Sequence, residues 1–260
     1  MDLFQLMQNQ IGFFLLIFTR ISGIFSTAPV FGSRNVSVYI KAGLSLLIAF
    51  ILFPLVFNSA AVLPENFFSY IFLVIGEFLI GLIFGFASSL VFSAVQMAGQ
   101  ILDMQIGFGI VNIFDPQSGQ QIPLVGNFQY ILALLIFLVT NSHHLLLAAL
   151  FGSFKLIPVT GAVFQAESLA DLMVDMVAGT FVIALKISLP VLVALLLTDI
   201  ALGILARTMP QMNIFMVGIP GKILVGLFVL SLALPVYITF LDVAFNGMYK
   251  DIYRLLSSFQ

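Results

Sequence analysis

The chain has 260 residues, of which 62% are hydrophobic and only 8% are charged. A soluble domain has about a quarter of its residues charged, so this composition excludes an ordinary soluble fold and indicates side chains surrounded by lipid or other apolar protein. The net charge of −2 provides no basic surface for nucleic acid, and a sequence without cysteine excludes thiol catalysis, iron–sulfur clusters and disulfide bonds.

Several apolar stretches approach the length of about 20 residues that a helix needs to cross a bilayer. In chain order they are Ile11–Phe31, Ala42–Phe57, Phe67–Val95, Phe128–Phe151, Val177–Leu197 and Ile223–Phe245. The residues before the first stretch include no lysine or arginine, so we expect that stretch to be retained rather than cleaved as a signal peptide. The sequence predicts an all-α membrane protein of about six long hydrophobic helical segments, arranged as hairpins in one domain over residues 1–260.

The connecting segments differ in character. Met97–Asn127 is long, rich in glycine and glutamine and almost uncharged. Lys155–Met176 carries acidic residues and is typical of an amphipathic helix on the surface. Thr198–Lys222 is half polar, and we expect its prolines, Pro210 and Pro220, to interrupt helical structure.

Some charged residues fall in or beside the apolar stretches, where an ionised group at mid-bilayer costs at least about 2.5–3.5 kcal/mol on insertion scales. They are Arg20, Glu77, Lys186, Asp199 and Asp242. One interpretation is an ion site or a proton relay, and the other is polar contact between helices or between subunits. The second is favoured because no two acidic residues share a helical turn in any stretch.

Small residues recur at every fourth position of the third stretch, behind a carboxylate. This ridge comprises Glu77, Gly81, Gly85, Ser89 and Ser93. Small side chains at such spacing let two helix backbones approach closely within a membrane. The ridge therefore predicts a neighbouring helix, which belongs either to this chain or to a partner.

A polar stripe follows the ridge. Gln96, Gly99, Gln100 and Asp103 lie at i, i+3, i+4 and i+7, and so share one side of a helix. A polar side on an otherwise apolar helix indicates contact with water or with polar groups of a partner. We expect these residues to line a lumen or a seam between subunits.

The segment from Gly107 to Pro123 combines glycines with turn-forming residues. Gly107, Phe108 and Gly109 resemble the start of a dinucleotide-binding loop, but no third glycine, preceding strand or following lysine completes such a motif. Asp115 and Pro116, followed by Gly119, are typical of a turn. Non-helical backbone at membrane depth is tolerated where it is buried in protein or lines a cavity. The segment is interpreted as a re-entrant plug or gate loop, with an ordinary loop outside the membrane as the alternative.

The sequence offers no candidate catalytic or metal site. His143 and His144 are adjacent, so on a helix they point about 100° apart and do not chelate one ion together. No acidic residue or cysteine nearby completes a ligand set, and the familiar hydrolase motifs are missing from the sequence. We expect neither enzymatic activity nor a metal or other cofactor.

Four sequence stretches carry a resemblance to a known family. They are RISGIFSTAPVFGSRNV from Arg20, QMAGQILDMQIGFGIVNIFDPQSG from Gln96, NSHHLLL from Asn141 and LPVLVALLLTDIALGILARTMPQMNIFMVGIPGKILVG from Leu189. In these stretches, and more weakly over nearly its whole length, the chain resembles the FliR family of flagellar type III export-gate proteins. The FDPQSG and GIPGK sequences are similar to the flagellar members rather than to the paralogues in virulence injectisomes, which remain the alternative.

The resemblance implies a structural and gating subunit in the bacterial inner membrane, at the flagellar basal body. Residues 1–127 would form a FliP-like half containing the plug loop 107–123, and residues 128–260 a FliQ-like half with a C-terminal tail. FliP and FliQ homologues are the expected partners in a channel entrance, with an FlhB homologue docked on it and membrane lipid around it. Unfolded flagellar proteins would pass when the plug moves, and Phe114, Asp115 and Pro116 would form its tip.

A different class of function stays open from the residues alone. In a secondary transporter, Glu77, Asp103 or Lys186 would couple substrate movement to ion movement. Transporter halves are normally internal repeats, and the sequence shows none, so this reading is less favoured.

Overall fold

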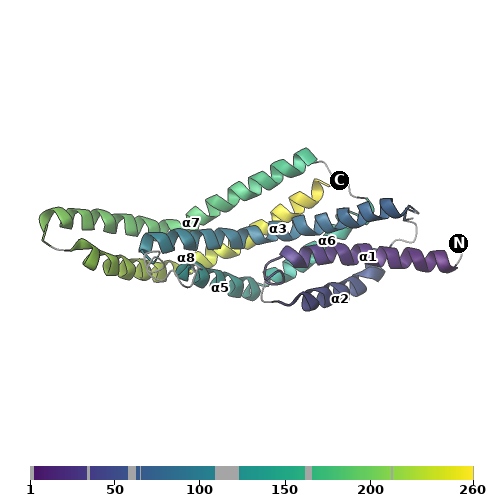
Figure 1. Ribbon diagram of the computed structural model, residues 1–260, viewed down its shortest axis with the longest axis horizontal. Helices are drawn as coiled ribbons and strands as arrows, with labels where there is room; N and C mark the ends of the chain where they lie inside the picture. Colours follow the sequence, from purple (N-terminus) through teal and green to yellow (C-terminus); the bar gives the residue numbers. More distant parts are fainter. Residues whose placement is uncertain are drawn as a thin grey trace. The chain divides into compact units, whose positions relative to one another are not determined.

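The computed structural model describes residues 3–33, 36–57, 63–64, 66–108, 123–161, 166–211 and 213–259. Within these ranges the secondary structure is helical throughout (Figure 1). The helices are α1 (Leu3–Thr27), α2 (Val38–Val56), α3 (Phe67–Ile106), α5 (Leu124–Val139), α6 (Ser142–Leu156), α7 (Ala166–Thr208) and α8 (Ile214–Ser257). Five are long and apolar enough to cross a membrane, or six helical spans if α5 and α6 count as one broken span. The predicted all-α membrane fold is confirmed.

Three helices are longer than the apolar stretches within them. α3, α7 and α8 contain 40, 43 and 44 residues. Pro190, Pro220 and Pro235 all lie inside helices, so the expectation that Pro220 interrupts helical structure is wrong. A proline inside a helix leaves the carbonyl four residues earlier without its helical N–H donor, and membrane helices tolerate this because neighbouring helices and side chains can satisfy such groups.

Two expected elements differ in their boundaries. The fourth apolar stretch is broken between α5 and α6, where Asn141 adopts a left-handed conformation with φ of 57°, which asparagine tolerates better than most residues. The predicted amphipathic helix over Lys155–Met176 does not form as a separate element. Its acidic residues Glu167, Asp171 and Asp175 instead lie exposed in the N-terminal part of α7, and Glu167, in the first turn, complements the positive end of the helix dipole.

The chain divides into two compact units that interleave along the sequence. Unit 1 comprises residues 1–90, 141–176 and 246–260, and unit 2 comprises residues 91–140 and 177–245. α3, α7 and α8 each contribute residues to both units. These units do not follow the predicted division at residue 127, which stays a prediction drawn from the family resemblance.

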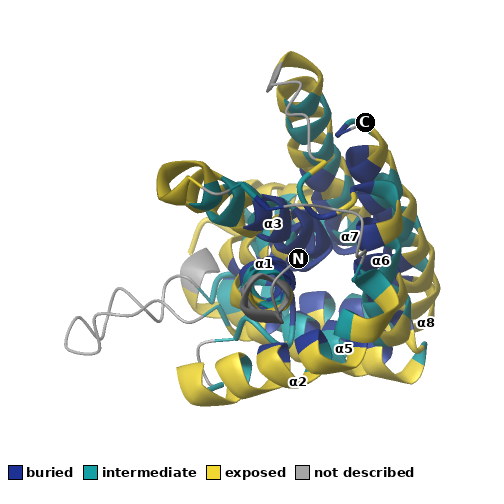
Figure 2. Cartoon of the chain, turned by 90° about the vertical axis from the view of Figure 1, so that its right-hand side faces the viewer, coloured by how far each residue is buried: buried dark blue, intermediate teal, exposed yellow. Residues whose placement is uncertain are grey.

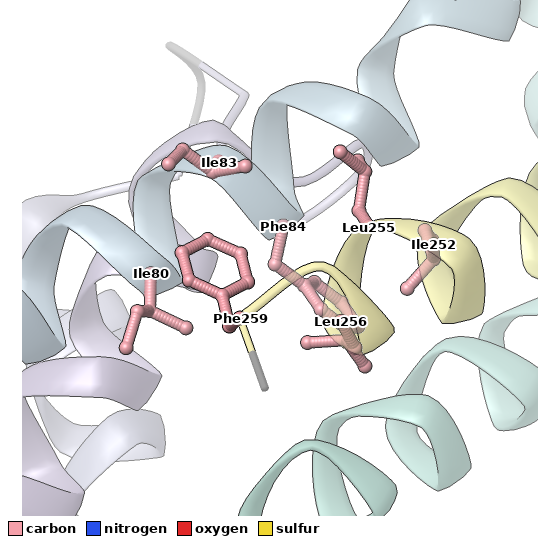
Figure 3. A pocket seen from close by; sticks show the side chains of 7 residues that line it. All are labelled: Ile80, Ile83, Phe84, Ile252, Leu255, Leu256 and Phe259. Carbon is pink, nitrogen blue, oxygen red and sulfur yellow. The ribbon is translucent and has the colours of Figure 1, made fainter. Parts of the chain in front are cut away.

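In unit 1, α1 is the most deeply buried membrane-capable helix, and α2 packs against it while leaving most of its own surface exposed (Figure 2). The end of the chain is also anchored here. Ile252, Leu255, Leu256 and Phe259 face Ile80, Ile83 and Phe84 of α3 around a small apolar pocket (Figure 3). Phe259 is only 2% exposed, so the last turn is held by burial of apolar area.

Unit 2 has a core built from α3, α5, α7 and α8. Its central cluster consists of buried aliphatic residues: Leu102, Ile106, Val125, Val191, Leu195 and Leu230. A second set of buried contacts joins the rings of Phe92, Phe137 and Phe245, whose centroids lie 5.2–5.4 Å apart. This core surrounds the point where α3 ends and α5 begins, which is where the predicted plug loop leaves and rejoins the helices.

Candidate functional site

Of the predicted plug loop, the structure describes the two ends. Gly107 and Phe108 follow α3, and Pro123 precedes α5. The predicted loop residues Gly109, Phe114, Asp115, Pro116 and Gly119 lie outside the described residues. Asp103, Gly107–Phe108 and Pro123–Gly126 form what we call the base of the loop.

Asp103 contacts both ends of the loop. Its carbonyl oxygen accepts hydrogen bonds from the N–H groups of Gly107 at 3.3 Å and Phe108 at 3.0 Å, which close the end of α3. Gly107 has a φ of +104°, a value that glycine adopts readily and that helices commonly use to terminate. The carboxylate of Asp103 accepts hydrogen bonds from the N–H group of Val125 at Oδ1 and from that of Gly126 at Oδ2, both at 3.0 Å.

The two Asp103 carboxylate contacts amount to a helix cap supplied from a distance. Pro123, at the N-cap position of α5, makes no side-chain hydrogen bond to the first turn. The first N–H groups of a helix lack partners within the helix and favour a negative charge. Asp103, buried at 5% exposure, provides that charge from α3. One residue thus contacts both ends of the intervening segment, with its backbone carbonyl at the end of α3 and its carboxylate at the start of α5.

A close contact between glycines lies beside this carboxylate. A Cβ atom built on Gly99 would lie 2.7 Å from the nitrogen of Gly126 and 3.2 Å from Oε1 of Gln129. No side chain fits there without moving backbone, so α3 and α5 are in direct backbone contact at this point. Gly99, the glycine of the predicted polar stripe, therefore allows α3 and α5 to approach closely.

A second polar network ties the end of α3 to the α7–α8 hairpin. Lys222 Nζ donates to Asp199 Oδ1 at 2.8 Å, and Gln105 Nε2 donates to Asp199 Oδ2 at 3.1 Å. Phe108 packs against the central aliphatic cluster of unit 2. The helices on which the loop is mounted are thus linked to one another by both polar and apolar contacts. Sequence reasoning named Asp199 but paired it with no residue, and it did not single out Lys222 as its partner.

The predicted polar stripe divides into two parts. Gln96 and Gln100 are exposed, whereas Gly99 and Asp103 are buried against α5. The two glutamines remain candidates for a lumen or a subunit seam. Asp103 is occupied within the chain.

In unit 1 the structure brings Arg20 and Glu77 together. Arg20 is 0% and Glu77 3% exposed, and the guanidinium forms a bidentate pair with the carboxylate, including Nη2 to Oε1 at 3.0 Å. Nη1 donates to the carbonyls of Ser153 at 3.2 Å and Ile157 at 3.0 Å, at the end of α6. Arginine can satisfy a carboxylate and free carbonyls at once because its donors form a rigid fork. The pair joins α1, α3 and α6 and leaves the guanidinium no free edge.

The ridge glycines Gly81 and Gly85 pack on α1. A Cβ on Gly81 would lie 3.0 Å from Cα of Gly23, and one on Gly85 would lie 2.8 Å from the carbonyl oxygen of Ile24. The neighbouring helix that the ridge predicted therefore belongs to this chain. Gly23, which the sequence analysis did not single out, completes the contact from the other side and follows Arg20 within one turn.

Lys186 lies in the apolar middle of α7. Its side chain is exposed on α7 and forms no ion pair or hydrogen bond with the described residues. His143 and His144 stack on each other with centroids 4.1 Å apart. No group of three or more metal-binding side chains occurs among the residues that the structure describes.

Comparison with known proteins adds a second line of evidence. Residues 11–248 match the model of the family described as bacterial export proteins, family 1. The chain is 39% identical over 246 residues to the flagellar biosynthetic protein FliR of Bacillus subtilis strain 168, covering 94% of each chain. It is 33% identical to that of Pectobacterium carotovorum over 257 residues, 97% of each chain. Its identity to that of Escherichia coli K12 is 31% over 240 residues, 92% of this chain and 88% of the relative.

Proposed function

This chain belongs to the FliR family of bacterial export proteins, and we propose that it forms, with FliP and FliQ homologues, the gated entrance of a flagellar protein-export channel. The chain is a membrane component of the flagellar export apparatus, with several helices long and apolar enough to span a bilayer. The inner membrane as its location, docking of an FlhB homologue and passage of unfolded flagellar proteins are parts of the proposal.

The gating role is supported by the hydrogen bonds at the base of the loop. Asp103 accepts N–H groups from both flanks of the segment between α3 and α5. A loop anchored in this way can change conformation between its ends while the helices that carry it stay in place. That is the mechanical requirement for a plug that opens and closes repeatedly. The glycines at 107, 109 and 119 supply backbone freedom for such rearrangement.

The structure argues against the transporter alternative at the residue on which it most depends. A coupling carboxylate must release and rebind an ion or a proton. Glu77 is held by a bidentate arginine in a buried site. Removing charge from one partner of such a buried pair is expected to destabilise the fold rather than to uncouple transport.

The proposal is tested by purification together with assay in cells. In a bacterium whose own FliR-encoding gene is deleted, this chain, expressed with its cognate FliP and FliQ homologues, should restore export of flagellar proteins. An affinity tag on the chain should recover both homologues in a complex of fixed composition. Recovery of the chain alone, together with transport of a small solute by the purified chain in liposomes, would contradict the proposal and support a transporter.

A further inference from the structure

The interior cations of this chain fall into two groups. Arg20 pairs with Glu77, and Lys222 pairs with Asp199. Lys186 lies near the centre of an apolar helix, is exposed, and has no such partner among the described residues. The first two cations are explained by the fold of the chain, and Lys186 is not.

The position of Lys186 along α7 limits what can neutralise it. It is the only charged residue between Asp175 and Asp199. At 1.5 Å rise per residue, these flanking charges lie about 16 and 20 Å away along the helix axis. No charge on its own helix therefore lies within reach of the Lys186 ammonium. A carboxylate carried on another helix is a suitable counter-ion for a lysine surrounded by apolar side chains.

The surface around Lys186 is apolar and open. On α7 its neighbours Val182, Leu189 and Val193 are 50%, 55% and 47% exposed. Beside it lies a pocket of about 50 Å³, to which α8 contributes Val236 and Tyr237 among other residues. An apolar face with a single charge at its centre is complementary to a second apolar helix with one opposite charge.

The carboxylates in the apolar parts of the helices are engaged within the part of the chain that the structure describes. Glu77 and Asp199 are paired with cations, and Asp103 is occupied by the N–H groups of α5. Asp242 also has an interaction within the structure. These contacts favour a counter-ion from a polypeptide of different sequence over one from a second copy.

We propose that the face of α7 and α8 around Lys186 docks an apolar helix of a different subunit, and that an aspartate or glutamate in that helix pairs with Lys186. The proposal rests on the proposed function, because it presupposes that the chain assembles with other membrane subunits. Beyond that function, it specifies the face of α7 and α8 that contacts the partner and the acidic residue that the partner places against Lys186.

The experiment uses the assembled complex from cells that express the chain with its cognate gate subunits. A carbodiimide joins amines to carboxylates only when they are in direct contact. We expect an isopeptide bond between Lys186 and an acidic residue in an apolar segment of another subunit, identified by mass spectrometry. It should be absent from Lys186→Arg, which should still assemble because the charge is kept.

Charge reversal provides the second measurement. Breaking a buried ion pair leaves an uncompensated charge, so Lys186→Glu should reduce recovery of the partner subunit about tenfold or more. Lys250→Glu, at an exposed position outside the apolar centre of α8, is the matched control and should assemble normally. Replacing the crosslinked carboxylate of the partner by lysine should restore assembly of Lys186→Glu.

The outcomes separate this inference from the proposed function. A complex that forms normally with Lys186→Glu, or in which Lys186 crosslinks only to its own chain or a second copy, overturns the inference and leaves the gate assignment standing. A chain recovered without any partner overturns both.

Discussion

At the scale of single residues, the buried polar groups of this chain act as connectors between helices. Asp103 uses its carbonyl to end α3 and its carboxylate to start α5. Arg20 uses one edge of its guanidinium for Glu77 and the remaining nitrogen for two carbonyls at the end of α6. In an apolar protein with few charges, each such group satisfies backbone atoms that water would satisfy elsewhere.

The first prediction concerns Asp103. Asp103→Asn keeps the shape of the side chain but removes the negative charge that faces the N–H groups of Val125 and Gly126. Asparagine has one acceptor oxygen where the carboxylate has two, so one of the two N–H groups would face an amide NH2 group and lose its hydrogen bond. Loss of one such cap costs about 0.5–2 kcal/mol, so we expect a looser loop base and a lower melting temperature of the purified complex. Asp251→Asn, which alters an exposed pair with Arg254, is the control and should leave the melting temperature unchanged. Equal melting temperatures for both variants would contradict the capping role.

The second prediction concerns the Arg20–Glu77 pair. Glu77→Gln leaves a buried guanidinium without a counter-charge, at a cost of about 3–5 kcal/mol, so the chain should accumulate poorly in membranes. The double variant Arg20→Met with Glu77→Leu removes both charges and should recover much of the lost accumulation. Immunoblotting of membrane fractions measures both effects. If Glu77→Gln accumulates normally but loses function, Glu77 has an active role beyond holding the helices together.

At the scale of elements, the contact between α1 and α3 depends on backbone proximity. Gly23 and Gly81 leave no room for side chains where the two helices approach. Such packing gives van der Waals contact over a long interface without any hydrophobic driving force between helices in lipid. Gly81 and Gly85 of the ridge are therefore part of the fold of unit 1.

The third prediction tests this packing. Gly85→Leu should prevent stable packing of α3 on α1, because even a Cβ at this position would lie 2.8 Å from the carbonyl of Ile24. Gly179→Leu, where nothing lies within 4 Å of the added Cβ, is the matched control and should be tolerated. Protease resistance of the chain in membranes distinguishes the two. A protease-resistant Gly85→Leu chain that merely fails to bind partners would place the ridge at a subunit interface instead.

The elements also show how far sequence reasoning reaches. Hydrophobicity and length were enough for the helical membrane fold, and four-residue spacing was enough to predict a helix against Gly81 and Gly85. The break at Asn141 and the continuity of α8 through Pro220 were missed, because tertiary contacts decide whether a helix tolerates such residues. The role of Asp103 was also missed. Its partners are 22 residues away across the loop, and only the fold brings them together.

At the scale of the whole molecule, the chain is a member of a protein-export family. Several of its charged residues in apolar helices, namely Arg20, Glu77, Asp103, Asp199 and Lys222, are bound to other groups of the same chain. Two features bear on assembly: the predicted plug segment, whose two ends meet at Asp103, and Lys186, which has no ion pair among the described residues. We interpret the first as the moving part of a gate and the second as a contact with another subunit. The apolar surface that remains exposed, on α2 above all, is available to lipid and to partners.

The central claim is that the segment between α3 and α5 closes the channel. Its most direct test is ion conductance across planar bilayers that contain the complex of this chain with its partner subunits. Deleting residues 110–120, which spares Asp103 and both helix ends, should convert a complex with little resting conductance into one that conducts steadily without substrate. Resting conductance that is the same with and without the segment would contradict the claim.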